Sequence, residues 1–242
     1  QREGQETEYP IDFLYHSIED SLTENEIQIT ANTEKAKKLH IDGAYHIAIP
    51  GDYNEGNAVA AAITSALMGA KPSEIEYGLS NTTVPGRMEI YQTKDHGTIY
   101  VDYAHNYGSL HSVLDFLKSQ APKSKVTVIT GSTGDKGIDR REGLGKAINE
   151  SADQAYLTTD DPATEDPKKI AEEIAQHIDT TQVATSYIAD RKQAITKAVT
   201  ESKKGDLVVV AGKGHDEYQK INGKNVPYEG DAAIVKNLVK GL

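Results

Sequence analysis

The sequence predicts an α/β protein that contains a mostly parallel sheet with helices on both faces. From Met88 onward, short apolar segments alternate with segments whose apolar residues recur every three or four positions. One apolar segment, 207–211, has no polar residue, which is typical of a strand buried on both faces. Strands and helices that alternate in this way usually form a parallel sheet with helices packed on each side.

The residues before Met88 predict a smaller block that is separated from the rest by a turn. Segments 27–30 and 45–49 alternate apolar and polar residues, as half-buried strands do. Residues 1–9 are polar and are expected to be mobile or to lie at an edge. Pro85 has a fixed φ angle and Gly86 accepts backbone angles that other residues avoid, so they predict a hinge-like turn.

Two helices are expected between the second of these strands and the turn. The first begins after Gly51 and ends at Gly69. The second begins with a capping box at 73–76, where Glu76 lies three residues after Ser73, and ends near Leu79. The apolar face of the first helix consists of Val59, Ile63, Ala66 and Leu67.

Beyond the turn, strands at 88–91 and 98–101 flank a turn at 95–97, and a helix follows Asn106. The apolar positions of that helix have the spacing i, i+3, i+4 and i+7, and are Leu110, Val113, Leu114 and Leu117. Further strands are expected at 126–130, 154–158, 185–188 and 207–211 and near Val226, and further helices at 141–151, from Asp166, from Asp190 to Ser202, and at 231–238.

Four of the predicted strands end in polar loops, at 102–106, 131–137, 159–163 and 212–216. The carboxyl ends of parallel strands meet at one edge of a sheet, so these loops are expected to converge on a ligand site. Glycines in the loops let backbone amides approach a ligand, and aspartates with Lys136 or Lys213 supply charge.

Composition excludes several kinds of protein. The chain has no cysteine, which excludes disulfides, cysteine-zinc sites and a cysteine nucleophile, and is compatible with a cytoplasmic location. A net charge of -11 argues against a nucleic-acid-binding surface. No apolar run approaches the ~20 residues of a membrane span, and no signal peptide is visible. The absence of an initial methionine suggests a piece of a longer chain.

Several common catalytic motifs are also missing. The sequence has neither a G-x-x-x-x-G-K-[ST] phosphate loop nor an early G-x-G-x-x-G. The eight histidines show no metal-binding spacing, so no metal site is predicted within the chain. Ser132 lacks the flanking residues of a hydrolase nucleophile.

A series of motifs along residues 45–242 resembles the Mur ligase family of peptidoglycan synthesis. The matching segments are 51–54, 57–61, 84–89, 102–105, 160–162, 190–191, 211–215 and 218–219. The resemblance implies that residues 1–86 are the incomplete tail of an α/β ATP-binding domain and that residues 87–242 are a Rossmann-like domain for an amino acid. The family's phosphate loop and magnesium ligands are expected upstream, so this fragment alone is expected to be inactive.

The reaction implied by the resemblance is ATP-dependent amide formation between an amino acid and a UDP-N-acetylmuramoyl-dipeptide, through an acyl phosphate. ATP and Mg²⁺ are the implied cofactors. Asn57 would face adenine and Arg87 would contact the nucleotide. Asp102 would contact ribose or support domain closure, and Tyr103 and His105 would frame its loop. The alternative interpretation of Asn57 is a helix cap, and that of Asp102 is a charge at a helix start.

The resemblance also bears on which amino acid is added. Relatives that add meso-diaminopimelate share an Asp-Asn-Pro-Arg loop whose arginine binds the second carboxylate, and here Asp161 and Ala163 replace its Asn and Arg. An acidic loop without that arginine favours L-lysine, with meso-diaminopimelate as the alternative and L-ornithine as a further possibility. The implied amino-acid site consists of Lys136, Asp160, Asp161, Ala163, Gly212, Lys213 and Asp216.

Two other classes of function stay open at this stage. One is a related ATP-dependent amide ligase, such as a folylpolyglutamate or cyanophycin synthetase, which would prefer a different acceptor. The other is a non-catalytic small-molecule-binding module that keeps the Rossmann-like shell. The oligomeric state is not predicted.

Overall fold

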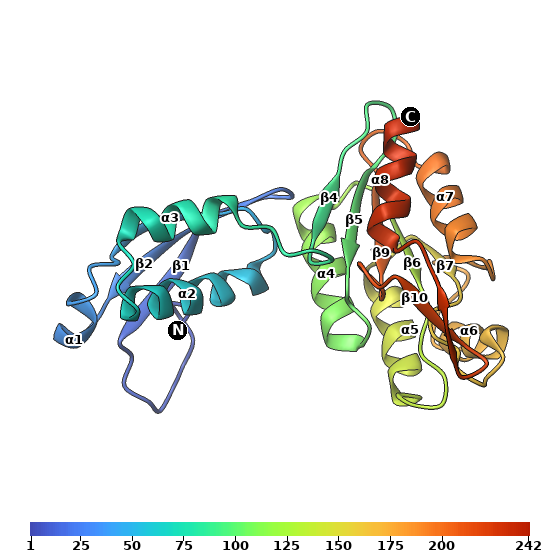
Figure 1. The fold of residues 1–242 in the computed structure, drawn as a ribbon, viewed down its shortest axis with the longest axis horizontal. Helices are drawn as coiled ribbons and strands as arrows, with labels where there is room; N and C mark the ends of the chain where they lie inside the picture. Colours follow the sequence, from blue (N-terminus) through green and yellow to red (C-terminus); the bar gives the residue numbers. More distant parts are fainter. The chain divides into compact units, whose positions relative to one another are not determined.

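The computed structural model describes residues 1–242 and divides into two compact units, Gln1–Val84 and Pro85–Leu242 (Figure 1). The division falls at the turn that contains Pro85 and Gly86. Each unit has its own sheet and its own buried core. No helix of the chain has both the length and the apolar composition that crossing a membrane requires.

The first unit is a three-stranded antiparallel sheet covered by helices. Alternate residues of a strand point to the same side, so Ile27 and Ile29 lie together in the core, where Val59 and Ala62 join them. Its elements are β1 (Phe13–Asp20), β2 (Asn25–Ala31), α1 (Glu34–Lys37), β3 (Gly43–Ile47), α2 (Asp52–Leu67) and α3 (Pro72–Asn81).

Three details of the first unit differ from the sequence prediction. Strand β1 and helix α1 were not predicted, since β1 is an edge strand without a regular alternation of apolar and polar residues and α1 is only four residues long. Leu67 is 68% exposed, because the buried face of α2 lies over Ala58 and Ala62 instead. The capping box of helix α3 lies two residues earlier than predicted, at 71–74, where the Lys71 backbone N–H donates to the Glu74 carboxylate at 2.7 Å.

The second unit confirms the predicted α/β fold. Its six-stranded sheet has the order β4-β5-β9-β6-β7-β8, and every neighbouring pair is parallel except β4 and β5. Central strand β9 is buried at all its positions, as its apolar sequence predicts. The strands are β4 (Glu89–Tyr91), β5 (Thr98–Asp102), β6 (Val126–Thr130), β7 (Gln154–Leu157), β8 (Ala184–Tyr187) and β9 (Leu207–Ala211).

Helices pack in two groups around this sheet (Figure 1). In one group α4 contacts α5 and α5 contacts α6, and the predicted apolar face of α4 is buried. In the other group α7 contacts α8, and both share a core with β9. The helices are α4 (Tyr107–Gln120), α5 (Asp139–Ser151), α6 (Pro167–Ala175), α7 (Arg191–Glu201) and α8 (Asp231–Gly241).

A separate antiparallel hairpin, β10 (Tyr218–Ile221) and β11 (Lys224–Pro227), replaces the single strand predicted near Val226. The hairpin is fastened to the loop that follows β7. Gln219 Nε2 donates to the carbonyls of Thr159 and Asp160 at 3.1 Å each, and the Ala163 N–H donates to the Lys220 carbonyl at 2.9 Å. The hairpin therefore supports one side of the strand-end edge.

Gly86 is fixed to the second unit, although its sequence predicts a hinge-like turn. Its carbonyl accepts from the Tyr103 N–H at 2.9 Å, and its own N–H donates to Glu89 Oε2 at 3.2 Å. With φ at +69°, a Cβ on Gly86 would lie 2.5 Å from the Tyr103 ring. Residues 81–85, which precede Gly86, are exposed.

Candidate functional site

The four polar loops meet at the carboxyl edge of the sheet and line one cavity of about 190 Å³. They meet because β5, β9, β6 and β7 are consecutive neighbours in the sheet, so their carboxyl ends lie side by side. The sequence-based prediction that these loops converge is therefore confirmed. The lining residues are Tyr103, His105, Gly131, Ser132, Thr133, Arg140, Asp160, Asp161, Gly212 and Asp216.

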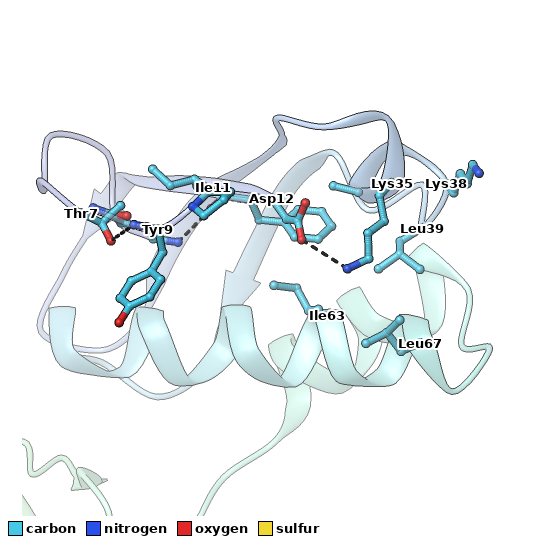
Figure 2. A pocket seen from close by; sticks show the side chains of 13 residues that line it. Thr7, Tyr9, Ile11, Asp12, Lys35, Lys38, Leu39, Ile63 and Leu67 are labelled. Atoms are coloured by element: carbon cyan, nitrogen blue, oxygen red, sulfur yellow. Dashed lines mark hydrogen bonds and ion pairs between the residues drawn. The ribbon is translucent and has the colours of Figure 1, made fainter.

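A larger cavity of about 580 Å³ lies in the first unit, between the segment before β1 and helices α1 and α2 (Figure 2). Its charged groups are at the rim: Lys35 is 85% exposed and lies 3.6 Å from the half-exposed Asp12 carboxylate. Ligand sites combine an apolar hollow with convergent polar groups inside it. The strand-end cavity meets this description better, and it is the candidate site.

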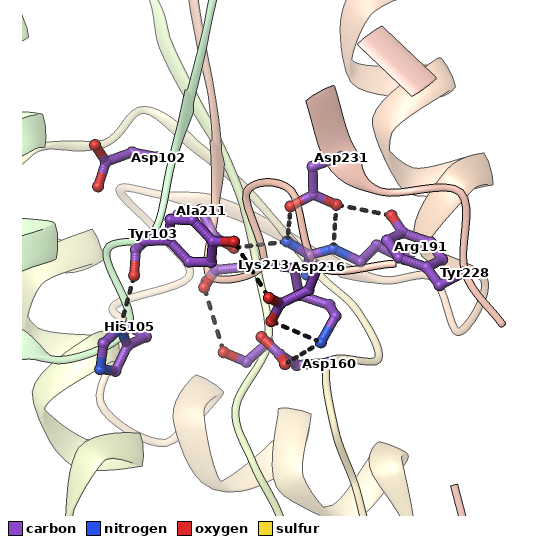
Figure 3. A network of polar contacts seen from close by, with 12 residues as sticks. Asp102, Tyr103, His105, Asp160, Arg191, Ala211, Lys213, Asp216, Tyr228 and Asp231 are labelled. Carbon is purple, nitrogen blue, oxygen red and sulfur yellow. Dashed lines mark hydrogen bonds and ion pairs between the residues drawn. The ribbon is translucent and has the colours of Figure 1, made fainter. Parts of the chain in front are cut away.

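Lys213 stands at the centre of a buried charge network beside the cavity (Figure 3). Its Nζ lies 2.8 Å from Asp161 Oδ1, 3.6 Å from Asp216 Oδ2 and 3.7 Å from Asp160 Oδ1, and its side chain is 1% exposed. Burial disfavours the charged ammonium, but the aspartates outweigh burial and raise the pKa of Lys213. Lys213 does not line the cavity, so its positive charge balances the negative charge of the aspartates and is not available to an anionic ligand.

The three aspartates differ in how available their carboxylates are to a ligand. Burial raises the pKa of Asp160, against the opposing effects of Arg191 and Lys213. Asp161 Oδ1 already accepts from Lys213 and from the Lys220 N–H at 2.9 Å. Asp216 is the most open, with 36% of its side chain exposed.

A second buried pair fixes the start of α7 to the start of α8. Arg191 Nε and Nη2 donate to the two Asp231 oxygens at 2.8 and 2.7 Å, and both side chains are 0% exposed (Figure 3). Arg191 Nη2 also donates to the Ala211 carbonyl at the end of β9, at 2.7 Å. The Tyr228 hydroxyl donates to Asp231 at 2.7 Å. The motif residue Arg191 therefore has a structural role here.

Asp102 and its neighbours occupy the end of β5. The two Asp102 carboxylate oxygens accept from the Met88 and Ala104 backbone N–H groups, each at 2.8 Å, and burial raises the pKa of Asp102. Tyr103 donates to Asp216 Oδ1 at 3.2 Å, and the exposed Arg87 guanidinium lies 5.3 Å from the Tyr103 ring centre. A ribose contact by Asp102 stays a prediction, since its oxygens already serve the backbone.

Some residues predicted for the site lie outside the cavity. Lys136 is exposed in the β6 loop and does not line it. Ala163 is 4% exposed, has a φ of +51°, and pairs with the hairpin rather than with the cavity. Asn57 lies in the first unit on the exposed side of α2, where its Nδ2 donates to Asn54 Oδ1 at 3.4 Å. Their ligand contacts stay predictions.

Two residues that the sequence did not single out as ligand contacts do line the cavity. Arg140 lies at the start of α5, which begins at Asp139 and not at the predicted Arg141. Ser132 was considered only as a nucleophile, yet its buried hydroxyl faces the same cavity. Their position two and ten residues after the end of strand β6 was the only available signal. No cluster of three or more acidic or histidine side chains suited to a metal ion is present in the chain.

A doubly wound domain whose neighbouring strand ends surround one charged cavity has a Rossmann-like fold. Residues 86–214 match the family described as "Mur ligase, glutamate ligase domain". The chain belongs to the Mur ligase family. It spans about half the length of the curated relatives it matches.

Among these relatives is the UDP-N-acetylmuramyl-tripeptide synthetase of Limosilactobacillus reuteri, 50% identical over 100% of this chain and 48% of the relative. The UDP-N-acetylmuramoyl-L-alanyl-D-glutamate–L-lysine ligase of Enterococcus faecalis is 47% identical over 84% of this chain and 40% of the relative. Of solved structures, a UDP-N-acetylmuramoyl-L-alanyl-D-glutamate–2,6-diaminopimelate ligase aligns with a TM-score of 0.64 and 28% identity, over 97% of this chain and 46% of that chain.

Proposed function

We propose that this chain is part of a cytoplasmic ATP-dependent ligase that joins L-lysine to UDP-N-acetylmuramoyl-L-alanyl-D-glutamate in peptidoglycan precursor synthesis. In this proposal residues 1–86 belong to the ATP-binding domain and residues 87–242 bind the amino acid. The observation that carries the proposal is the strand-end cavity, which is lined by one arginine without a partner and by three aspartates. A zwitterion with an additional ammonium group suits such a cavity.

The chemistry proposed is amide formation through an acyl phosphate. ATP activates the terminal carboxylate of the nucleotide peptide, the free amine of lysine attacks the acyl carbon, and phosphate leaves the tetrahedral intermediate. The residues of this chain would contribute by position and charge. Arg87, exposed at the end of the turn, would contact the nucleotide, and Asn57 would lie near adenine. Mg²⁺, when bound, would screen the phosphate charges, and residues outside this chain would hold it.

The charges around the cavity support L-lysine over meso-diaminopimelate. A second substrate carboxylate would need a second cation, but Lys213 is occupied by three aspartates and Lys136 lies outside the cavity. The side-chain ammonium of lysine could instead approach Asp216, the most exposed of the aspartates. The likeness to folylpolyglutamate synthase rests on 19% identity and reflects the shared fold alone.

The test is a comparison of amino acids in the full-length ligase. We expect kcat/KM for L-lysine to exceed that for meso-diaminopimelate by about ten- to a hundredfold, the worth of one unmatched charged hydrogen bond. L-ornithine, which has a shorter side chain, should lie below L-lysine. Equal or better use of meso-diaminopimelate would contradict the proposed substrate, and incorporation of neither would contradict the proposed reaction.

A further inference from the structure

A carboxylate outside the strand-end cavity joins the turn at Gly86 to the loop that carries Asp216. Glu89, in strand β4, accepts from the Gly86 N–H at 3.2 Å, and its Oε2 also lies 2.7 Å from Nε2 of His215. Neither Glu89 nor His215 lines the cavity. Burial opposes the charge of Glu89, but hydrogen bonds from Tyr91, His215 and the Gly86 N–H outweigh burial and lower the pKa of this carboxyl. Glu89 is therefore ionised at neutral pH and holds two separate parts of the chain.

Asp216 depends on this contact because His215 is its neighbour in the loop after β9. The His215 backbone N–H donates to the Tyr103 hydroxyl at 3.2 Å, and that hydroxyl donates to Asp216 Oδ1 at 3.2 Å. On its other side the loop is held by the Ala232 N–H, which donates to the Gly214 carbonyl at 3.2 Å. A Cβ on Gly214 would lie 2.6 Å from the Tyr103 ring, so the loop packs directly on this ring. These few contacts set the position of the Asp216 carboxylate.

We propose that Glu89 and His215 are positioning residues, which hold the loop so that Asp216 faces the incoming amino acid. This inference rests on the proposed function, in which Asp216 receives the side-chain ammonium of L-lysine. The Glu89 carboxylate also holds the backbone beside Arg87, which in the same proposal contacts the nucleotide. Loss of Glu89 should therefore affect both substrates, and loss of the His215 imidazole only the amino acid.

The first test removes the imidazole. The His215 side chain is 46% exposed, so His215→Ala should leave the second unit folded, with an unchanged Tm. In the full-length ligase His215→Ala should raise the KM for L-lysine about threefold to tenfold, the size of one lost hydrogen bond, and leave the KM for ATP unchanged. His215→Gln, whose Nε2 can still donate to Glu89, should keep most of the affinity for L-lysine. His46→Ala removes a similarly exposed imidazole that lies 2.9 Å from Glu76, and should change neither constant.

The second test removes the carboxylate. Glu89→Ala should raise the KM values of both L-lysine and ATP, because it releases the turn at Gly86 as well as the loop. Glu89→Gln keeps an acceptor oxygen, so both KM values should stay within about threefold of those of the unmodified ligase. If Glu89→Ala does not fold, the comparison of His215→Ala with His215→Gln decides the claim without it.

A double-mutant cycle separates positioning from a general effect on stability. Asp216→Asn removes the proposed contact with the lysine ammonium and should raise the KM for L-lysine on its own. In the His215→Ala background Asp216→Asn should have an effect about threefold smaller, because the carboxylate is already displaced. Two effects that simply multiply, or an unchanged KM for L-lysine in His215→Ala, would overturn the positioning role. Failure of the unmodified ligase to use L-lysine would instead refute the proposed function.

Discussion

Replacing Arg191 with leucine is expected to destabilise the second unit by about 3–5 kcal/mol, the usual result of removing one partner from a buried ion pair. The substitution leaves the Asp231 carboxylate, which is 0% exposed, without the two hydrogen bonds from the guanidinium. It also removes the donor to the Ala211 carbonyl at the end of β9. Urea unfolding followed by circular dichroism measures the change in the free energy of unfolding.

Two comparisons make this result specific to the buried pair. Arg191→Leu combined with Asp231→Leu removes both charges and should cost much less than the single change. Lys192→Leu removes the next residue along, whose ion pair with Glu229 is partly exposed, and should cost about 0–1 kcal/mol. A loss for Arg191→Leu no larger than that for Lys192→Leu would show that the buried pair does not hold α7 to α8.

Gly134→Ala is expected to lower kcat/KM for L-lysine about a hundredfold in the full-length ligase, because small displacements at a reacting site have effects of this size. A Cβ on Gly134 would lie 1.9 Å from the Pro162 carbonyl oxygen, which is backbone and cannot rotate away. The Gly134 N–H also donates to the Asp161 carbonyl at 2.8 Å. The added methyl group must therefore separate the β6 and β7 loops and widen the cavity.

A matched glycine in the first unit provides the control. Gly78 lies within α3, and a Cβ placed there would meet no atom within 4 Å. Gly78→Ala should stabilise the protein by about 0.5–1 kcal/mol, since alanine loses less backbone freedom in a helix. It should leave kcat/KM for L-lysine unchanged. If Gly134→Ala also left it unchanged, the contact between the β6 and β7 loops would not matter for the amino acid.

Elements with a strong local signal could be predicted from the sequence. The apolar spacing of α4 and its cap Asn106, whose side chain accepts from the Ser109 N–H at 3.0 Å, depend on neighbours within one helical turn. The convergence of the four loops could also be predicted, because it follows from the order of parallel strands. Strand β1 could not be predicted, because its pairing with β2 defines it and its own sequence does not alternate apolar and polar residues.

The details of the site depended on contacts between distant parts of the chain. Lys213 and Asp161 are 52 residues apart, so their pairing and its effect on the cavity charge were not visible in the motifs. The motif containing Ala163 suggested a residue that reaches the substrate, but a φ of +51° and the bond to Lys220 turn it toward the hairpin. Arg140 could be placed at the cavity only from the fold, which brings the start of α5 to the strand ends.

We propose that the strand-end cavity of the second unit receives the amino acid. The most direct test of this proposal is a crystal structure of the full-length ligase with L-lysine, the nucleotide peptide and a non-hydrolysable ATP analogue. We expect the lysine between the four loops, with an ammonium group near Asp216. Lysine bound outside the cavity would contradict this proposal.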